Sequence, residues 1–243
     1  MVLKIHNKDD FISRFLNPVS KINNSCILKL TNTGISTLLS AADNTAILLG
    51  QYDVDIDIDD VTLNLPDVSR LIKIIQCIAD DDITLDINGN HIQYNSEDVR
   101  FKYHLLEDGI LMSPSISVDK IKSIDYNTTL SLPYQSIINL IKSSSFTMDI
   151  NKVYISTNES SVYAEIGDNQ AHNVDSIRIK MCTGYTGTPI NEPLPVSLET
   201  IRILAGSRCE TVDTFINSEL NVMTFKINND NVTLTYVISG LMK

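Results

Sequence analysis

Residues 61–105 constrain the fold more than any other part of the chain, because they combine a strand, a helix and a three-stranded meander in one stretch. An amphipathic helix is expected over residues 66–78, opening on Pro66, since proline suits a first helical position. Its apolar residues recur at the spacing of a single helix face: Val68, Leu71, Ile72, Ile75 and Ile78. Strands are expected at residues 83–87, 91–95 and 99–105, separated by turn-forming Asn-Gly-Asn and Asn-Ser-Glu-Asp. The segment therefore predicts one helix packed on an antiparallel sheet.

The same order of elements recurs along the rest of the chain. Further helices are expected after Asn7, which caps a helix ended by Pro18, at 133–145 opening on Leu132-Pro133, and at 195–208 opening on Leu194-Pro195. For the count of charges below, the window of the first helix is residues 8–21. Short strands follow each of these helices, at residues 26–31, 34–41, 45–51, 52–59, 152–157, 161–165, 175–183, 222–227 and 232–238. Helices this short cannot bury their apolar faces alone, so the repeats must pack together.

This repetition predicts an α+β fold made of two duplicated domains, residues 1–106 and 128–243. The segment between them, residues 107–127, breaks the pattern with Gly109, Pro114 and several serines. We interpret it as an interdomain connector that crosses the surface.

Composition excludes several classes of protein and of site. No signal peptide and no apolar run long enough to span a membrane is present, so a cytoplasmic protein is expected. The four cysteines, Cys26, Cys77, Cys182 and Cys209, are far apart and have apolar neighbours, which favours buried free thiols. The four histidines are equally scattered, so no zinc site is predicted.

Charge is divided unevenly between the predicted helices and the rest of the chain. The net charge is −11, which taken as a whole disfavours contact with nucleic acid. The four helical windows nevertheless hold eight basic residues against four acidic ones, a balance of +4 that leaves −15 elsewhere. Mixed charge is ordinary on surface helices. That interpretation does not explain why, in all four repeats, the helix is more positive than the strands around it. The eight basic residues are Lys8, Arg14, Lys21, Arg70, Lys73, Lys142, Arg202 and Arg208.

No catalytic or metal-binding motif is found. Asp53, Asp55, Asp57 and Asp59 alternate with apolar residues, which places four carboxylates on one strand face. A calcium loop would require glycine at Ile58 and glutamate at Asn64, so a solvated outer face is the better interpretation. Phosphate-loop and nucleophile-elbow motifs are also absent. We therefore expect no enzyme activity, no metal and no cofactor.

With these features together, the chain resembles the DNA sliding clamps, the family of proliferating cell nuclear antigen and of the tailed-phage clamps. The closest segment is VTLNLPDVSRLIKIIQCIADDDITL, in which a strand ending in Asn-Leu leads into a helix with two basic residues, and an acidic turn precedes an ITL strand. The chain length suits two-domain clamps that close as trimers. The asparagine- and isoleucine-rich composition, and a connector without the cellular motifs, favour a phage clamp, which would act in the host cytoplasm.

The resemblance implies a fold, a function and a set of sites. Antiparallel sheets would form the outside of a ring, and the four short helices its inner face, where the eight basic residues would contact the phosphates of encircled duplex DNA without reading sequence. The chain would act as a homotrimeric processivity factor for a DNA polymerase, opened by an ATP-dependent clamp loader. Partner peptides would dock at Ile110, Leu111, Met112, Leu241 and Met242, unless these residues only pack the connector onto the sheet. Edge strands would close the ring through Arg100, Phe101, Lys102, Tyr103, Ile177, Arg178, Ile179 and Lys180, unless their charges serve to protect free edges.

The sequence also allows two other functions and one other assembly. A non-enzymatic, all-β viral structural or interaction protein would explain the Asn/Thr-rich strands but not the basic helices. A hydrolase using the Asp53–Asp59 face would bind a divalent metal on that strand. The clamp fold could also belong to one member of a heteromeric ring.

Overall fold

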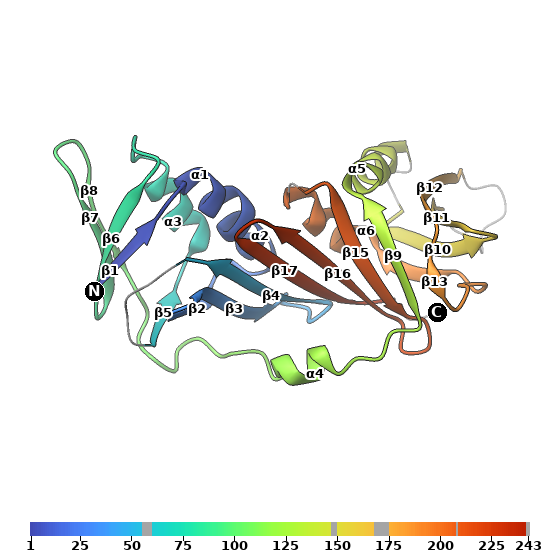
Figure 1. Ribbon diagram of the computed structural model, residues 1–243, viewed down its shortest axis with the longest axis horizontal. Coiled ribbons are helices and arrows are strands. Elements are labelled where there is room, and N and C mark those ends of the chain that lie inside the picture. Colours follow the sequence, from blue (N-terminus) through green and yellow to red (C-terminus); the bar gives the residue numbers. More distant parts are fainter. Residues whose placement is uncertain (55–59, 147–149, 168–174, 208, 242–243) are drawn as a thin grey trace. The chain divides into compact units, whose positions relative to one another are not determined.

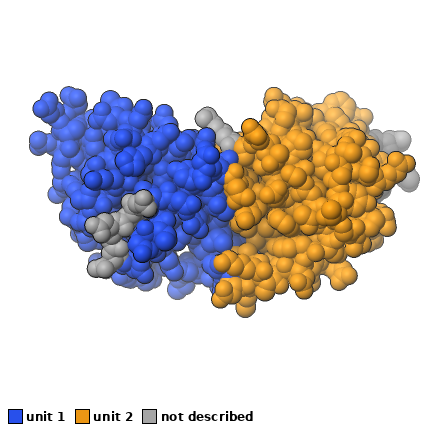
Figure 2. Space-filling view, viewed as in Figure 1, with its two compact units in different colours: residues 1–118, 229–234 blue, residues 119–228, 235–243 orange. Residues whose placement is uncertain are grey.

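The computed structural model describes residues 1–54, 60–146, 150–167, 175–207 and 209–241. The chain divides into two compact units, shown in Figure 2: unit 1 is Met1–Val118 with Asn229–Leu234, and unit 2 is Asp119–Asn228 with Thr235–Lys243. The change of unit after Val118 falls inside the segment 107–127 that the sequence predicts as a connector. A short helix there, α4 (Val118–Lys122), was not predicted.

Unit 1 contains a strand, a helix and three strands, followed by the same series again (Figure 1). The first series is β1 (Val2–Ile5), a helix built from α1 (Lys8–Asp10), the π-helical η1 (Phe11–Leu16) and α2 (Asn17–Ile22), then β2 (Cys26–Thr31), β3 (Gly34–Ser40) and β4 (Ala46–Asp53). The second is β5 (Val61–Leu65), α3 (Val68–Ile75), β6 (Ile83–Asn88), β7 (His91–Asn95) and β8 (Arg100–His104). The strands pair antiparallel in the orders β4-β3-β2-β5 and β1-β6-β7-β8.

The second half of the chain repeats this series with one added two-residue strand, β13, and residues 229–234 around its last turn belong to unit 1. It comprises β9 (Thr128–Pro133), α5 (Tyr134–Ser143) with the 3₁₀ turn η2 (Ser144–Phe146), β10 (Lys152–Asn158), β11 (Ser161–Ile166), β12 (Ile177–Thr183), the two-residue β13 (Thr186–Gly187), β14 (Leu194–Ser197), α6 (Leu198–Ile203) with η3 (Leu204–Gly206), β15 (Thr211–Asn217), β16 (Val222–Asn229) and β17 (Val232–Ser239). Its strand orders, β12-β11-β10-β14 and β9-β15-β16-β17, match those of unit 1. The predicted duplicated α+β architecture is therefore confirmed.

Each helix is stabilised by packing its apolar face against a sheet. In unit 1, Phe15 and Leu16 are fully buried, and Phe11 meets the edge of the Tyr52 ring of β4 with ring centroids 5.0 Å apart. Along α3 the buried residues are Val68, Leu71, Ile72 and Ile75, four of the five predicted for the stripe, and Ile78 is buried just beyond the helix. Within each unit the two helices pack side by side, α2 against α3 and α5 against α6 (Figure 1).

Four predictions about prolines were wrong in detail. The first helix does not end at Pro18 but continues to Ile22, since Pro18 lies in the first turn of α2, directly after the π-helical turn, where a missing N–H is tolerated. The second helix begins after Asp67, not at Pro66. Pro133 and Pro195 do not open helices: Pro133 ends β9, and Pro195 lies within β14 at the end of its sheet, a position that proline tolerates.

Five strands were not predicted from the sequence, and one cysteine was misplaced. The strands are β1, β9, β13, β14 and β15. Cys26 and Cys182 are buried and Cys209 is half-buried, but Cys77 is exposed just after α3. Burial raises the pKa of Cys26 to about 12 and that of Cys209 to about 11, so both are thiols at neutral pH. Part of the predicted strand 52–59 lies outside the described residues, and with it Asp55, Asp57 and Asp59.

Candidate nucleic-acid interface and neighbouring surfaces

The start of α3 is held in place by side chains on both sides of it. Asp67 caps the helix by accepting a hydrogen bond from the backbone N–H of Arg70 at 2.8 Å. Asn24 donates to the Asp67 carboxylate at 2.8 Å and accepts from the backbone of Ser69 at 2.9 Å. The pKa of Asp67 is held below its usual value, mainly by the hydrogen bond from the Arg70 backbone. The Asn24 hydrogen bond and the nearby cations lower it further.

This anchored helix presents Arg70 and Lys73 to solvent. Both side chains are exposed, and both lie opposite the buried stripe of the helix. The structure records no ion pair for either among the residues it describes. Two unneutralised cations on one rigid helix can contact phosphates without specifying a base.

Tyr103 of β8, predicted at the subunit interface, turns its side chain into its own unit. Its side chain is buried, and its hydroxyl donates to the Asp67 carbonyl at 2.7 Å and accepts from the Asp67 N–H at 2.9 Å. Burial raises the pKa of Tyr103 to about 12. The side chain braces α3 from the sheet side, so any contact of Tyr103 with another subunit would be made by its backbone.

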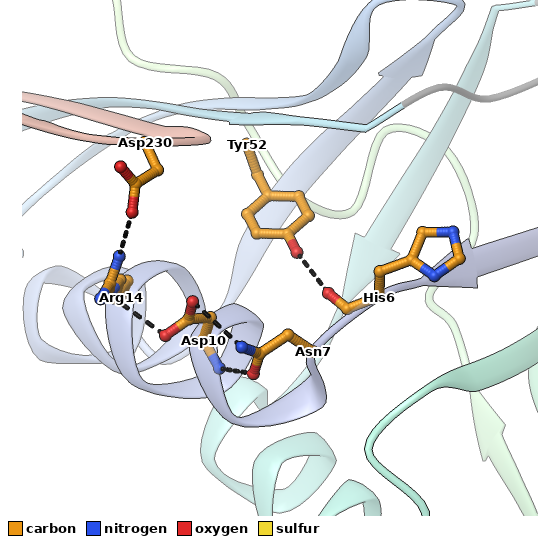
Figure 3. Close-up of polar contacts among 6 residues, drawn as sticks. All are labelled: His6, Asn7, Asp10, Arg14, Tyr52 and Asp230. Atoms are coloured by element: carbon orange, nitrogen blue, oxygen red, sulfur yellow. Dashed lines mark hydrogen bonds and ion pairs between the residues drawn. The ribbon is translucent and has the colours of Figure 1, made fainter.

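Arg14, on η1, is shared between two carboxylates (Figure 3). Its Nε lies 3.1 Å from Oδ1 of Asp10, one helical turn earlier, and its Nη1 lies 3.2 Å from Oδ2 of Asp230, in the turn between β16 and β17. Asp10 is itself held by Asn7, whose side-chain oxygen caps the helix by accepting from the Asp10 N–H at 3.0 Å. Nothing in the sequence marks Asp230 as a neighbour of Arg14, because the two are 216 positions apart.

Lys8 was predicted to contact DNA, and the structure contradicts this. The side chain is buried, and its ammonium donates to the carbonyl of Ile78 at 2.5 Å, beyond the end of α3. A buried ammonium that is hydrogen-bonded inside the fold is a structural tie. Lys21, at the other end of the same helix, is exposed, and its contact with DNA stays a prediction.

In unit 2 the predicted cations have different surroundings. Lys142 is exposed at the end of α5. Arg202 of α6 forms an ion pair with Glu199 of the same helix and donates to the Ser144 hydroxyl at 3.0 Å, which ties α6 to the end of α5. Arg208 lies outside the described residues.

The two predicted interface strands both lie at the end of a sheet. Among the described strands, β8 pairs only with β7, and β12 only with β11. Arg100, Lys102 and Lys180 are exposed, while the Arg178 guanidinium lies 4.2 Å from the centre of the Tyr163 ring.

Apolar residues at these two edges are incompletely covered. Phe101, Ile177 and Ile179 alternate with the charges and are half-exposed. The cross-strand partners of Ile177 and Ile179 are Ile166 and Ala164, which are fully buried. The apolar layer therefore continues to the edge without cover from the described chain.

A groove of about 460 Å³ lies between the connector and the β2-β3-β4 strands of unit 1. Residues 113–118 form one wall, and the other includes Ile27, Lys29, Leu38 and Leu49. The apolar residues of the connector that were predicted to bind a partner end directly before this wall. Ile116 and Val118 alternate with serines, a pattern typical of a segment with one side packed against a sheet. This pattern could have predicted from the sequence that the connector lies along the strands here.

The five predicted partner-binding residues are placed as follows. Ile110 and Met112 are exposed, Met112 to 90%, while Leu111 is half-exposed. Leu241 is held by its backbone: its N–H donates to the Pro195 carbonyl at 2.9 Å, and its carbonyl accepts from the Asn221 side chain at 2.8 Å. Met242 lies outside the described residues.

The described parts of the chain contain no cluster of three His, Cys, Asp or Glu side chains able to hold a metal ion. Within the same ranges, no helix has the length and apolar character required to cross a membrane.

Comparison with known proteins gives a match in fold but none in sequence. No protein-family model matches the chain, and no curated protein matches it. Among solved structures, PCNA from A. fulgidus, bound to the C-terminal region of FEN-1, superposes with a TM-score of 0.79 at 10% identity, covering 100% of this chain and 98% of that one. PCNA from Entamoeba histolytica gives 0.76 at 12% identity, with 99% and 98% covered. The PCNA2–PCNA3 complex from Sulfolobus tokodaii gives 0.72 at 9% identity, with 99% of both covered. The chain thus has the α+β clamp fold over its full length.

Proposed function

We propose that this chain is a sliding clamp: a homotrimeric ring that encircles duplex DNA and tethers a replicative DNA polymerase, with no catalysis of its own. The full-length match to the clamp fold supports this proposal, because the matched proteins include three PCNA structures. The unequal distribution of charge supports it independently of fold.

The observation that carries the proposal is the presentation of Arg70 and Lys73. In a protein of net charge −11, these two cations have no ion pair within the described parts of the chain, and their helix begins at a turn fixed by Asp67, Asn24 and Tyr103. A clamp needs contacts that are electrostatic, few and indifferent to sequence, so that it stays near DNA and still moves along it. Lys21 and Lys142, and Arg14 and Arg202 once released from their carboxylates, would add to these contacts.

The proposal assigns partners to two further surfaces. The groove between residues 113–118 and the β2-β3-β4 face would take a peptide segment from the polymerase or from the ATP-dependent loader that opens the ring, because its lining combines apolar residues with serines of the connector. The half-covered edges of β8 and β12 would pair between subunits and close the ring.

A charge-reversal variant tests the central claim. Arg70→Glu/Lys73→Glu should weaken binding to a short labelled DNA duplex and flatten its salt dependence, by about 0.9 in the log–log slope for each phosphate that the variant no longer neutralises. It should also abolish DNA-dependent stimulation of the cognate polymerase. The matched control is Lys4→Glu/Lys226→Glu, which changes net charge equally but at exposed positions on strands β1 and β16. Equal DNA binding by both variants would refute the clamp function and favour an interaction protein.

A further inference from the structure

The carboxylate of Asp230 occupies one side of the Arg14 guanidinium. Arg14 is one of the basic residues expected to contact the phosphates of DNA. We propose that Asp230 competes with DNA phosphate for Arg14 and so weakens the grip of the clamp on DNA. The inference rests on the proposed function and adds a residue that sets the strength of the DNA contact.

The two carboxylates on Arg14 are not equivalent (Figure 3). Asp10 is one turn away on the same helix, is 30% exposed, and is joined to Asn7 through both its backbone N–H and its carboxylate. The Asp230 side chain is 90% exposed and contacts only Arg14 among the described residues. Exposed ion pairs are weak and exchange readily with other anions, so Asp230 is the partner that a phosphate would displace.

The turn that contains Asp230 does not itself require a negative charge. Its backbone has a φ of 27°, in the left-handed region that asparagine and glycine also adopt readily. Asparagines stand on both sides of it, and the carbonyl of Asn231 accepts from the Asp53 N–H at 2.7 Å, so the turn is held to β4 through its backbone. The charge of Asp230 therefore has its main consequence at Arg14.

Two carboxylates around one guanidinium leave a local charge of −1 at the start of this helix. A phosphate approaching Arg14 meets that charge until Asp230 swings away, because Asp230 holds Nη1 and Asp10 holds Nε, and each carboxylate repels a further anion. Such a contact forms and breaks more easily than a free arginine–phosphate pair, which suits a ring that must move along DNA.

The test is Asp230→Asn, which keeps the shape and the backbone preference of the residue and removes only its charge. Binding to a short labelled duplex at low salt should tighten, by up to about fivefold per subunit. Asp230→Gly, which also accepts a positive φ, should show the same gain. Thermal unfolding of both variants verifies that the turn remains folded.

A double-mutant cycle assigns the gain to Arg14. In the Arg14→Gln background, Asp230→Asn should produce no tightening, since the competed cation is gone. Asp86→Asn serves as the matched control, because it removes one carboxylate from β6 in the same unit and should leave affinity near that of the wild type.

Each other outcome overturns the inference. Weaker binding by Asp230→Asn would mean that Asp230 positions Arg14 instead of competing for it, and an equal gain from Asp86→Asn would mean a general charge effect. Failure of the proposed function is recognised separately: wild-type protein would then show no salt-dependent DNA binding, and Arg70→Glu/Lys73→Glu would behave like wild type.

Discussion

The surroundings of each basic side chain, and not the helix cap before it, decide whether that side chain is available. Asn7 and Asp67 each cap a helix, and each helix carries cations, yet the results differ. After Asn7, Lys8 turns inward to the Ile78 carbonyl and Arg14 is taken up by carboxylates. After Asp67, the cations of α3 stay exposed. The difference lies in the environment of each side chain, which helical periodicity alone does not reveal.

The cap at Asp67 leads to a prediction at this scale. Asp67→Ala should lower the free energy of unfolding by about 1 kcal/mol at neutral pH, because α3 loses its capping acceptor. The pKa of Asp67 lies below its usual value of 3.8, so the charged carboxylate contributes stability at neutral pH that is lost as the pH falls through that lowered pKa. The deficit of the variant, measured by urea unfolding, should therefore shrink in strong acid. Asp80→Ala, at an exposed turn position, is the control, and an equal, pH-independent deficit in both variants would contradict the cap.

At the scale of elements, tight hairpins set the register of the sheets. Gly34 has a φ of 138°, and its backbone faces Asp53 across the β3-β4 ladder. A Cβ atom there would lie 2.3 Å from the Tyr52 carbonyl oxygen. Gly89, in the β6-β7 turn, also has a positive φ of 41°, but a Cβ atom there would meet nothing within 4 Å.

These two glycines form a matched pair for a prediction. Gly89→Ala should cost about 1 kcal/mol, since only the backbone conformation is strained. Gly34→Ala should cost more, about 2–4 kcal/mol, because strand β4 must also move away. Urea unfolding of both variants measures the difference. Equal losses would show that the β3-β4 ladder can open at Gly34 without cost.

Elements of this kind also show what the sequence could predict. β2 and β7 were predicted to the residue, because alternating apolar residues end at clear Asn/Gly turns. β9 and β14 were absorbed into predicted helices, since Leu-Pro pairs resemble helix starts. Of the candidate site, the cations of α3 followed from periodicity. The burial of Lys8, the Asp230 contact and the groove at residues 113–118 depend on neighbours distant in sequence, which no local pattern encodes.

For the whole molecule, the open question is what covers the edges of β8 and β12. Each ends a sheet, each has half-exposed apolar side chains along the rim, and each carries exposed cations that discourage random pairing. A ring of identical chains would use one edge of each kind per contact, so that every edge in the assembly is paired. Three copies joined in this way would leave no edge of this type free.

Ile179→Asp tests that assembly. Burying a carboxylate in the apolar layer between two subunits should weaken each contact by about a hundredfold or more. Sedimentation at a series of protein concentrations should give a mass near three chains for wild type and a mass falling toward one chain for the variant. Leu220→Asp is the control, because Leu220 is 66% exposed in the turn after β15 and belongs to neither edge strand, and the mass of this variant should match wild type. A wild-type chain that stays monomeric at high concentration would contradict a homotrimeric ring, and a trimer unaffected by Ile179→Asp would place the subunit contact elsewhere.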